Sequence, residues 1–310
     1  MSEDNADRSW RRTRAKREFL LRCGRTLARW RVVRVKNGHY YSPVPSLREI
    51  DADASRIFDQ SLRPLPGIEL NADAQLVLLE QFGGYYTEHP FPETPRPDCR
   101  YFFDNYWYDR SDALFLYSFI RHFRPSRIVE IGSGFSSAVM LDTNERFMDR
   151  RMRLTFVEPE SGRLRKLLKA DDQQAVTIVE RRIQQIDPSI IEQLDPNDIL
   201  FVDSSHVSKA GSDVNHILFE LLPRLKPGVL VHFHDVRFPF EYPKEWFELG
   251  VSWNEAYILR AFLQFNKEFP IVFWNDYMVK FHADAVRRRM PMCVERLSFG
   301  VNGSLWLRRA

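Results

Sequence analysis

The run RIVEIGSGFSS, residues 127–137, constrains the fold of this chain more than any other feature. Its first half is rich in β-branched apolar residues, which predicts a buried strand, and Gly132 and Gly134 then allow a sharp turn. The turn opens a helix, so it presents amide N–H groups and the positive end of the helix dipole. Ligands bind at such turns in open parallel sheets. The run therefore predicts a site for a carboxylate or a phosphate.

Polar residues at later strand ends narrow the choice of ligand. A dinucleotide-binding turn has a third glycine three residues after the second, and this chain has Ser137 there. The next predicted strand ends in Glu158, whose carboxylate can accept hydrogen bonds from two ribose hydroxyls. Two later strands end in Asp203 and in the pair His234-Asp235. We expect these groups to line one crevice, because the carboxyl ends of parallel strands share one edge of the sheet.

Apolar strand patterns alternate with helical patterns along the second two thirds of the chain. This alternation predicts an α/β fold with a doubly wound, mostly parallel, seven-stranded Rossmann-like sheet. The predicted strands are residues 127–131, 154–158, 176–180, 198–203, 229–234, 271–275 and 304–308.

The amino-terminal part has a different character. Residues 8–36 contain 12 Lys and Arg against one acid, and apolar residues recur there at helical spacing. We favour docking of this basic helix on the chain's own core over binding to nucleic acid or an anionic membrane surface. Four prolines between residues 90 and 97 indicate a linker. We therefore predict an N-terminal helical appendage over residues 1–100 and a core domain over residues 101–310.

Composition sets outer limits on location and assembly. The 310 residues, 44% of them hydrophobic, are enough for one large core. No run approaches the ~20 apolar residues of a transmembrane segment, and the first residues do not have the pattern of a signal peptide. Three widely spaced cysteines favour a reducing compartment. We expect a cytoplasmic protein, and the sequence leaves open whether it forms a homo-oligomer.

Four motifs in order carry a family resemblance. The sequence EIGSG, followed by VEP, DILFVDSSH and LKPGVLVHFHD, resembles class I S-adenosylmethionine-dependent methyltransferases, close to the catechol O-methyltransferase-like and macrocin-type branches. The resemblance covers roughly residues 101–310. It implies S-adenosyl-L-methionine as the methyl donor, transfer to an oxygen of a small-molecule acceptor, and an antiparallel last strand.

The resemblance implies a set of donor-binding residues. Glu130 and the glycine turn would hold the methionine end of the donor, Glu158 would hold the ribose, and the adenine would lie near Ile183 and Gln184. The full predicted set is Glu130, Gly132, Ser133, Gly134, Ser136, Glu158 and Gln184.

Two modes of acceptor activation stay open. Asp203, His206, His234 and Asp235 are the predicted catalytic residues. In the first mode, which the resemblance implies, Asp203, His234 and Asp235 hold a divalent metal, which would be magnesium if oxygen ligands dominate or a transition metal if histidine takes part. In the second mode His206 or His234 removes the acceptor proton without a metal. His232 lies deeper in its strand and is predicted to be a core residue.

Specificity and alternative functions complete the predictions. Aromatic residues at 106–108 and in the segment 236–246 are expected to form the walls of an acceptor pocket. One alternative function is a dinucleotide-dependent oxidoreductase on a similar sheet. The other is a non-enzymatic binder of nucleic acid or membrane surface through the basic N-terminal helix.

Overall fold

The structure is a computed structural model that describes residues 35–294 and 303–310. The chain divides into two compact units: residues up to Ile57 with Phe247–Ser252, and Phe58–Trp246 with Trp253–Ala310. Most of the predicted basic helix lies outside the described residues. In the described part of the first unit, Ser46 caps the short helix α2 (Leu47–Ala52), and α3 (Ala54–Ile57) follows.

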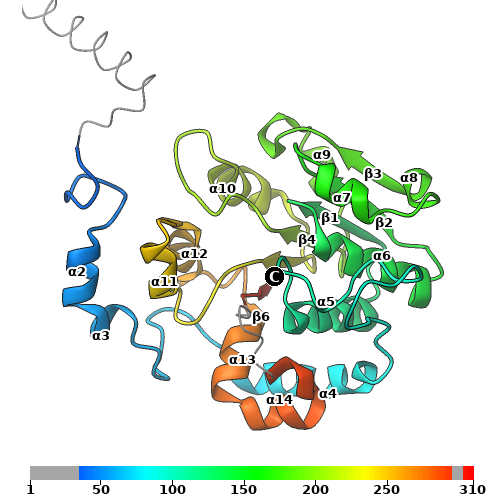
Figure 1. Cartoon of the computed structure of the whole chain (residues 1–310), viewed down its shortest axis with the longest axis horizontal. Helices are drawn as coiled ribbons and strands as arrows, with labels where there is room; N and C mark the ends of the chain where they lie inside the picture. Colours follow the sequence, from blue (N-terminus) through cyan, green and yellow to red (C-terminus); the bar gives the residue numbers. More distant parts are fainter. Residues whose placement is uncertain (1–34, 295–302) are drawn as a thin grey trace, which may run out of the picture. The chain divides into compact units, whose positions relative to one another are not determined.

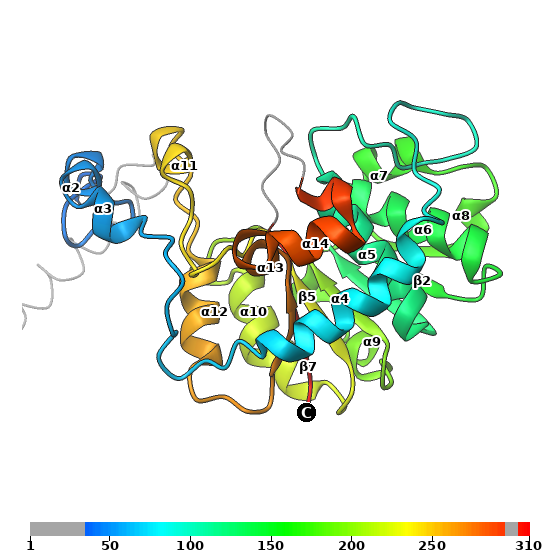
Figure 2. The ribbon, with the colours of Figure 1, turned by 90° about the horizontal axis from the view of Figure 1, so that it is seen from below.

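A seven-stranded sheet forms the centre of the second unit, in the order β3-β2-β1-β4-β5-β7-β6. Strands β1 to β4 are labelled in Figure 1, and β5 and β7 in Figure 2. The strands are β1 (Arg127–Ile131), β2 (Arg153–Val157), β3 (Val176–Val179), β4 (Ile199–Val202), β5 (Leu230–Phe233), β6 (Ile271–Trp274) and β7 (Leu305–Arg308). The first five strands run parallel, whereas β7 is antiparallel to β5 and β6. The predicted mostly parallel sheet and its antiparallel last strand are confirmed.

Helices connect and cover the strands. They are α4 (Ala72–Tyr86), α5 (Arg110–Phe123), α6 (Phe135–Phe147), α7 (Gly162–Leu167), α8 (Asp172–Ala175), α9 (Ser189–Glu192), α10 (Asp213–His216), α11 (Lys244–Glu248), α12 (Glu255–Leu263), α13 (Asn275–Phe281) and α14 (Ala283–Arg289). Helix α4 packs against α5 and α14, as Figure 2 shows for α4 and α14. Residues 72–86 therefore pack with the sheet, and the predicted domain boundary at residue 100 stays a prediction. Within the described ranges, every helix is too short or too polar to cross a lipid bilayer.

The core lies on both faces of the central strands. Every residue of β4 and β5 is buried, which explains their nearly continuous apolar sequence. Phe119 of α5 stacks on Trp306 of β7 with ring centroids 3.7 Å apart. His232 lies in this core, as predicted, and its ring stacks on Phe201 at 3.9 Å. Neither of its ring nitrogens has a hydrogen-bond partner among the described residues, and burial lowers the pKa of His232 well below its usual value.

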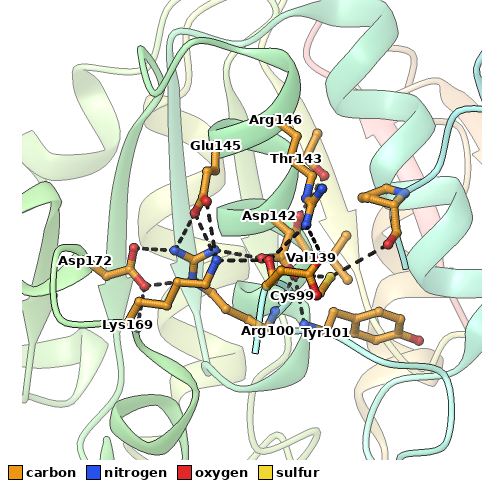
Figure 3. Close-up of polar contacts among 12 residues, drawn as sticks. Cys99, Arg100, Tyr101, Val139, Asp142, Thr143, Glu145, Arg146, Lys169 and Asp172 are labelled. Carbon is orange, nitrogen blue, oxygen red and sulfur yellow. Dashed lines mark hydrogen bonds and ion pairs between the residues drawn. The ribbon is translucent and has the colours of Figure 1, made fainter. Parts of the chain in front are cut away.

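A buried ion cluster joins the segment before α5 to two helices (Figure 3). The side chain of Arg100, 2% exposed, forms ion pairs of 2.7 Å with Asp142 and Glu145 of α6 and with Asp172 of α8. Asp142 also accepts hydrogen bonds from the backbone N–H groups of Arg100 and Tyr101. The cluster therefore fixes the start of residues 102–109, a segment that borders the site described next.

Candidate active site

The glycine turn after β1 is locked to the end of β4. Gly132 has φ of +81°, a conformation that L side chains rarely adopt, and a Cβ atom there would lie 1.8 Å from the carbonyl oxygen of Asp203. The amide of Asp203 donates to the carbonyl of Ile131 at 2.8 Å, and the amide of Gly132 donates to the carbonyl of Val157 at 3.0 Å. Glycine at position 132 therefore allows the ends of β1, β2 and β4 to meet.

Glu130 lies beneath this turn and is fully buried. Its carboxylate accepts hydrogen bonds from the hydroxyls of Ser136, at 2.5 Å, and Ser137. Burial raises the pKa of Glu130 to about 8, although the serine hydroxyls oppose this shift. Ser137, which occupies the position of the absent third glycine, also accepts a hydrogen bond from the amide of Gly134 at 3.0 Å. Glu130 and Ser137 thus fix the first turn of α6, and a direct contact between Glu130 and the donor stays a prediction.

Glu158 reaches the same turn from the end of β2. One of its carboxylate oxygens accepts a hydrogen bond from the amide of Ser133 at 3.1 Å, and the other accepts from the amide of Glu160 at 2.7 Å. The side chain is half-buried and lines two cavities at the carboxyl edge of the sheet. It therefore lies where a ligand on the glycine turn could contact it.

The two cavities have volumes of about 790 and 410 Å³. Both are lined by Gly132, Glu158, Asp203, Ser204 and Ser205. The smaller cavity extends to Ile183 and Gln184. The larger cavity extends to Tyr106, Trp107, Trp246 and Trp253, which include residues from both segments predicted to wall an acceptor pocket.

In the smaller cavity, Gln184 has one satisfied and one unsatisfied polar atom. Its amide nitrogen donates to the carbonyl of Gly211 at 2.9 Å, and its buried amide oxygen has no hydrogen-bond partner among the described residues. The oxygen is therefore free to accept a hydrogen bond from a ligand in this cavity.

Three of the predicted catalytic residues come together in the larger cavity. The Nε2 atom of His206 lies 3.2 Å from Oδ1 of Asp203 and 3.8 Å from Oδ2 of Asp235. One ligand atom from each of the three residues lies within 4.8 Å of the other two. His206 and Asp235 have φ of +58° and +56°. Such strained backbone persists when surrounding structure enforces it, and it is frequent at functional sites.

The ring of His206 is held from its other side by Glu255, a buried residue at the start of α12. Its Nδ1 atom lies 2.8 Å from the Glu255 carboxylate, and its backbone carbonyl accepts hydrogen bonds from the amides of Asn254 and Glu255. Burial alone would lower the pKa of His206, but hydrogen bonds with Asp203 and Glu255 raise it well above its usual value. Burial likewise opposes ionisation of Asp203, but His234 and His206 lower the pKa of this carboxyl. Asp203 and Glu255 therefore favour the protonated form of His206, which lies between their carboxylates.

His234 lines the cavity beside this cluster rather than within it. Its ring lies 5.2 Å from that of Tyr108, and its Nδ1 atom is buried with no hydrogen-bond partner among the described residues. Burial lowers the pKa of His234, but the charges of Asp235, Asp203 and Asp112 raise it overall. The structure thus brings His206, not His234, between Asp203 and Asp235, and the predicted metal role of His234 stays a prediction.

The larger cavity is also lined by residues that the sequence did not single out as site residues, among them Asp109, Asp112, Arg163 and Arg237. Asp109 caps α5, and burial raises its pKa to about 6. Asp112 is held by hydrogen bonds from Asn275 and Ser304, which are more than 160 residues away in sequence. The sequence around Asp112 indicates only a residue in the first turn of a helix, so no sequence signal marks Asp112 as part of the site.

Comparisons with known proteins agree with this geometry. A family model described as a methyltransferase domain matches residues 129–236, which run from within β1 to the residues just after β5. An uncharacterized protein of Archaeoglobus fulgidus is 36% identical over 164 residues, which cover 52% of this chain and 73% of the relative.

Solved structures with a similar arrangement include two methyltransferases. The SAH-bound methyltransferase PaMTH1 of Podospora anserina is 15% identical with a TM-score of 0.43, and the match covers 88% of this chain and 99% of that chain. The O-methyltransferase TomG of Streptomyces achromogenes, in complex with SAM, is 15% identical with a TM-score of 0.41, over 84% and 96% of the two chains. Likeness at this level carries no weight in the assignment.

The assignment rests on the family model and on the agreement of the sheet with the four motifs. The matched residues contain the glycine turn, Glu158, Asp203 and the His234-Asp235 pair, all at one edge of the parallel strands. This set favours a methyltransferase over the dinucleotide-dependent oxidoreductase that the turn alone left open. Residues 129–236 form a methyltransferase domain, and this part of the chain places it with the class I S-adenosylmethionine-dependent methyltransferases.

Proposed function

We propose that this methyltransferase acts on an oxygen of a small-molecule acceptor, and that Asp203, His206 and Asp235 activate the acceptor together with a divalent cation. The observation that carries the proposal is the convergence of these three residues in the larger cavity, whose lining also includes Gly132 of the glycine turn and Glu158 at the end of β2. Methyl transfer requires donor and acceptor to be about 3 to 3.5 Å apart, so an activating group must lie near the turn.

The donor assignment follows from the two cavities. The glycine turn would receive the methionine carboxylate, and Glu158 would accept hydrogen bonds from the ribose hydroxyls. The smaller cavity at Ile183 and Gln184 would hold the adenine, for which the unpaired amide oxygen of Gln184 supplies an acceptor. The acceptor would then occupy the larger cavity, where aromatic side chains form a pocket suited to a planar or sugar-like molecule.

The three side chains suit a divalent cation in spacing and in chemistry. Ligand bonds of about 2.0 to 2.3 Å place opposite ligand atoms within about 4.6 Å of each other, close to the 4.8 Å that bounds the cluster. Two carboxylates with one imidazole favour a transition metal over magnesium. A bound cation would supply charge that lowers the pKa of an acceptor hydroxyl.

Glu255 would orient this ligand set. Metal-binding histidines usually donate their second ring N–H to a carboxylate, which fixes the direction of the metal-binding nitrogen. The Glu255 carboxylate would accept this hydrogen bond from Nδ1 of His206, and it also accepts a hydrogen bond from the Ser204 hydroxyl at 3.1 Å. His206 must lose a proton to bind a metal, so binding would release that proton.

A second candidate mode uses His206 as a general base without a metal, and the Glu255–His206 pair favours it. In that arrangement Glu255 would stabilise the imidazolium that forms when His206 accepts the acceptor proton. The close approach of Asp203 argues against this mode, because it keeps His206 protonated and leaves little basicity at neutral pH.

Metal analysis of the purified protein tests the proposal and separates the two modes. We expect about one divalent cation per chain, loss of turnover after chelation, and recovery when the cation is restored. Asp203→Ala should abolish turnover and lose the cation while it keeps most of the donor affinity. Asp284→Asn, an exposed acid on α14 that pairs with Arg287, is the matched control and should leave both unchanged. Full turnover in chelated enzyme would refute the metal mode and favour the histidine base.

A further inference from the structure

Arg237 is a buried cation without an anionic partner among the described residues. It follows β5 by a few residues, is 6% exposed, and lines the larger cavity. Among the residues that the structure describes, none accepts a hydrogen bond from its guanidinium or forms an ion pair with it, and its buried Nε is unsatisfied. The ring of Trp246 lies against the guanidinium, with its centroid 4.6 Å from Cζ.

Arg237 differs in this respect from Arg100, the buried arginine of the ion cluster described above. Arg100 has three acidic partners at 2.7 Å. A buried charge is costly unless it is paired, and arginine usually pairs with a carboxylate or phosphate through two parallel hydrogen bonds. A guanidinium that no described carboxylate pairs with therefore lies at the wall of a cavity, where a ligand can reach it.

Four carboxylates act on the charge of Arg237, namely Asp235, Asp276, Asp112 and the exposed Glu245, and the first three of them are engaged elsewhere. Asp276 forms an ion pair of 2.6 Å with Lys280 and accepts a hydrogen bond from the amide of Phe238. Asp112 accepts hydrogen bonds from the side chains of Asn275 and Ser304. Asp235 faces the His206 cluster. Burial lowers the pKa of Arg237 more than these carboxylates raise it, which is consistent with a charge that they only partly compensate.

Aromatic rings lie between Arg237 and the cluster of Asp203, His206 and Asp235. Trp246, beneath the guanidinium, meets Trp253 edge-on at 5.0 Å, and Trp253 lies 4.3 Å from the ring of His206. A wall of aromatic rings thus runs from the guanidinium of Arg237 to His206, the residue that contacts Asp203 and Asp235. A ligand on this wall would have its anionic end at Arg237 and its reacting end at His206.

We propose that Arg237 binds a carboxylate or phosphate of the acceptor, so that the enzyme methylates an anionic, planar small molecule. The proposal rests on the function proposed above for the larger cavity and narrows its substrate class. Trp246 holds the guanidinium plane, which lowers the ordering cost of binding. The anion would displace water and pair the buried charge.

Binding of simple probes tests the proposal without donor, metal or turnover. We expect benzoate or phenyl phosphate to quench the fluorescence of wild-type protein and to raise its melting temperature, and the neutral benzamide to do neither at equal concentration. Tighter binding of one anionic probe would identify carboxylate or phosphate as the preferred group. Equal effects of benzamide and both anions on the wild type would overturn the proposal even if no variant folded.

Variants assign the effect to the side chain. Arg237→Gln should weaken binding of the anionic probe by about ten- to a hundred-fold, the effect of losing hydrogen bonds to a charged group, and leave S-adenosylmethionine affinity unchanged as evidence of folding. Arg237→Lys should restore part of the loss, since it keeps the charge without the planar fork. Arg287→Gln, exposed on α14, is the matched control. Unchanged anion binding in folded Arg237→Gln would refute the proposal, whereas a failed metal test would leave it standing.

Discussion

Replacement of Arg100 by methionine should destabilise the protein strongly, and the structure sets the magnitude. The substitution keeps much of the side-chain volume but leaves Asp142 and Asp172 buried without their cation. Removal of one partner from a buried ion pair costs about 3 to 5 kcal/mol. Asp142 keeps two backbone N–H donors, and Asp172 keeps the amide of Lys169, so we expect the lower end, about 3 kcal/mol.

Urea unfolding followed by circular dichroism measures this loss. A loss of about 3 kcal/mol should also lower the melting temperature by about 6 to 12 °C. Arg151→Met is the matched control, because the Arg151 side chain is 83% exposed and its ion pair with Asp149 spans 3.8 Å. Exposed pairs contribute at most about 1 kcal/mol. If the two variants unfold at the same urea concentration, the reasoning about the buried cluster is wrong.

Three predictions concern the site. Glu158→Ala should weaken S-adenosylmethionine binding by about 1.5 to 3 kcal/mol in calorimetry, whereas the exposed neighbour Glu160→Ala should not; equal affinities would place the ribose elsewhere. Gly132→Ala should destabilise the fold by more than about 2 kcal/mol in urea, because its Cβ meets the Asp203 carbonyl; wild-type stability would contradict the close contact. Because the folded state raises the pKa of His206, this group stabilises the metal-free protein below about pH 6.5 and loses its contribution as pH rises through the raised value. The stability deficit of Glu255→Gln should therefore shrink from pH 5.5 to pH 9, and a constant deficit would exclude this linkage.

The sheet could be predicted because its signals are local. Strand β1 matches the predicted residues 127–131, since a buried parallel strand is apolar along its whole length. The glycine turn, too, carries its own evidence, because only glycine tolerates the contact at position 132. Short motifs were therefore enough to locate the strand and the glycine turn at which the donor is predicted to bind.

The acceptor side depends on contacts between distant residues. His206 turns toward Asp203 because its backbone adopts a positive φ and because Glu255, 49 positions later, holds its ring. No periodicity in the sequence predicts either condition, which is why His234 and His206 could not be ranked. The sequence also could not predict that Arg237 has no anionic partner among the described residues, since the absence of a contact leaves no pattern in a sequence.

The contact between Gly132 and the carbonyl of Asp203 has a consequence for divergence within the family. The space between Gly132 and the Asp203 carbonyl is too small for a Cβ atom, and the Asp203 amide bonds to Ile131, so a shift of the glycine turn would displace Asp203 as well. Relatives that acquire new substrates would then retain this edge of the sheet and vary residues 102–109 and 236–246. The chemistry would be inherited through the strands, and the choice of acceptor through the loops.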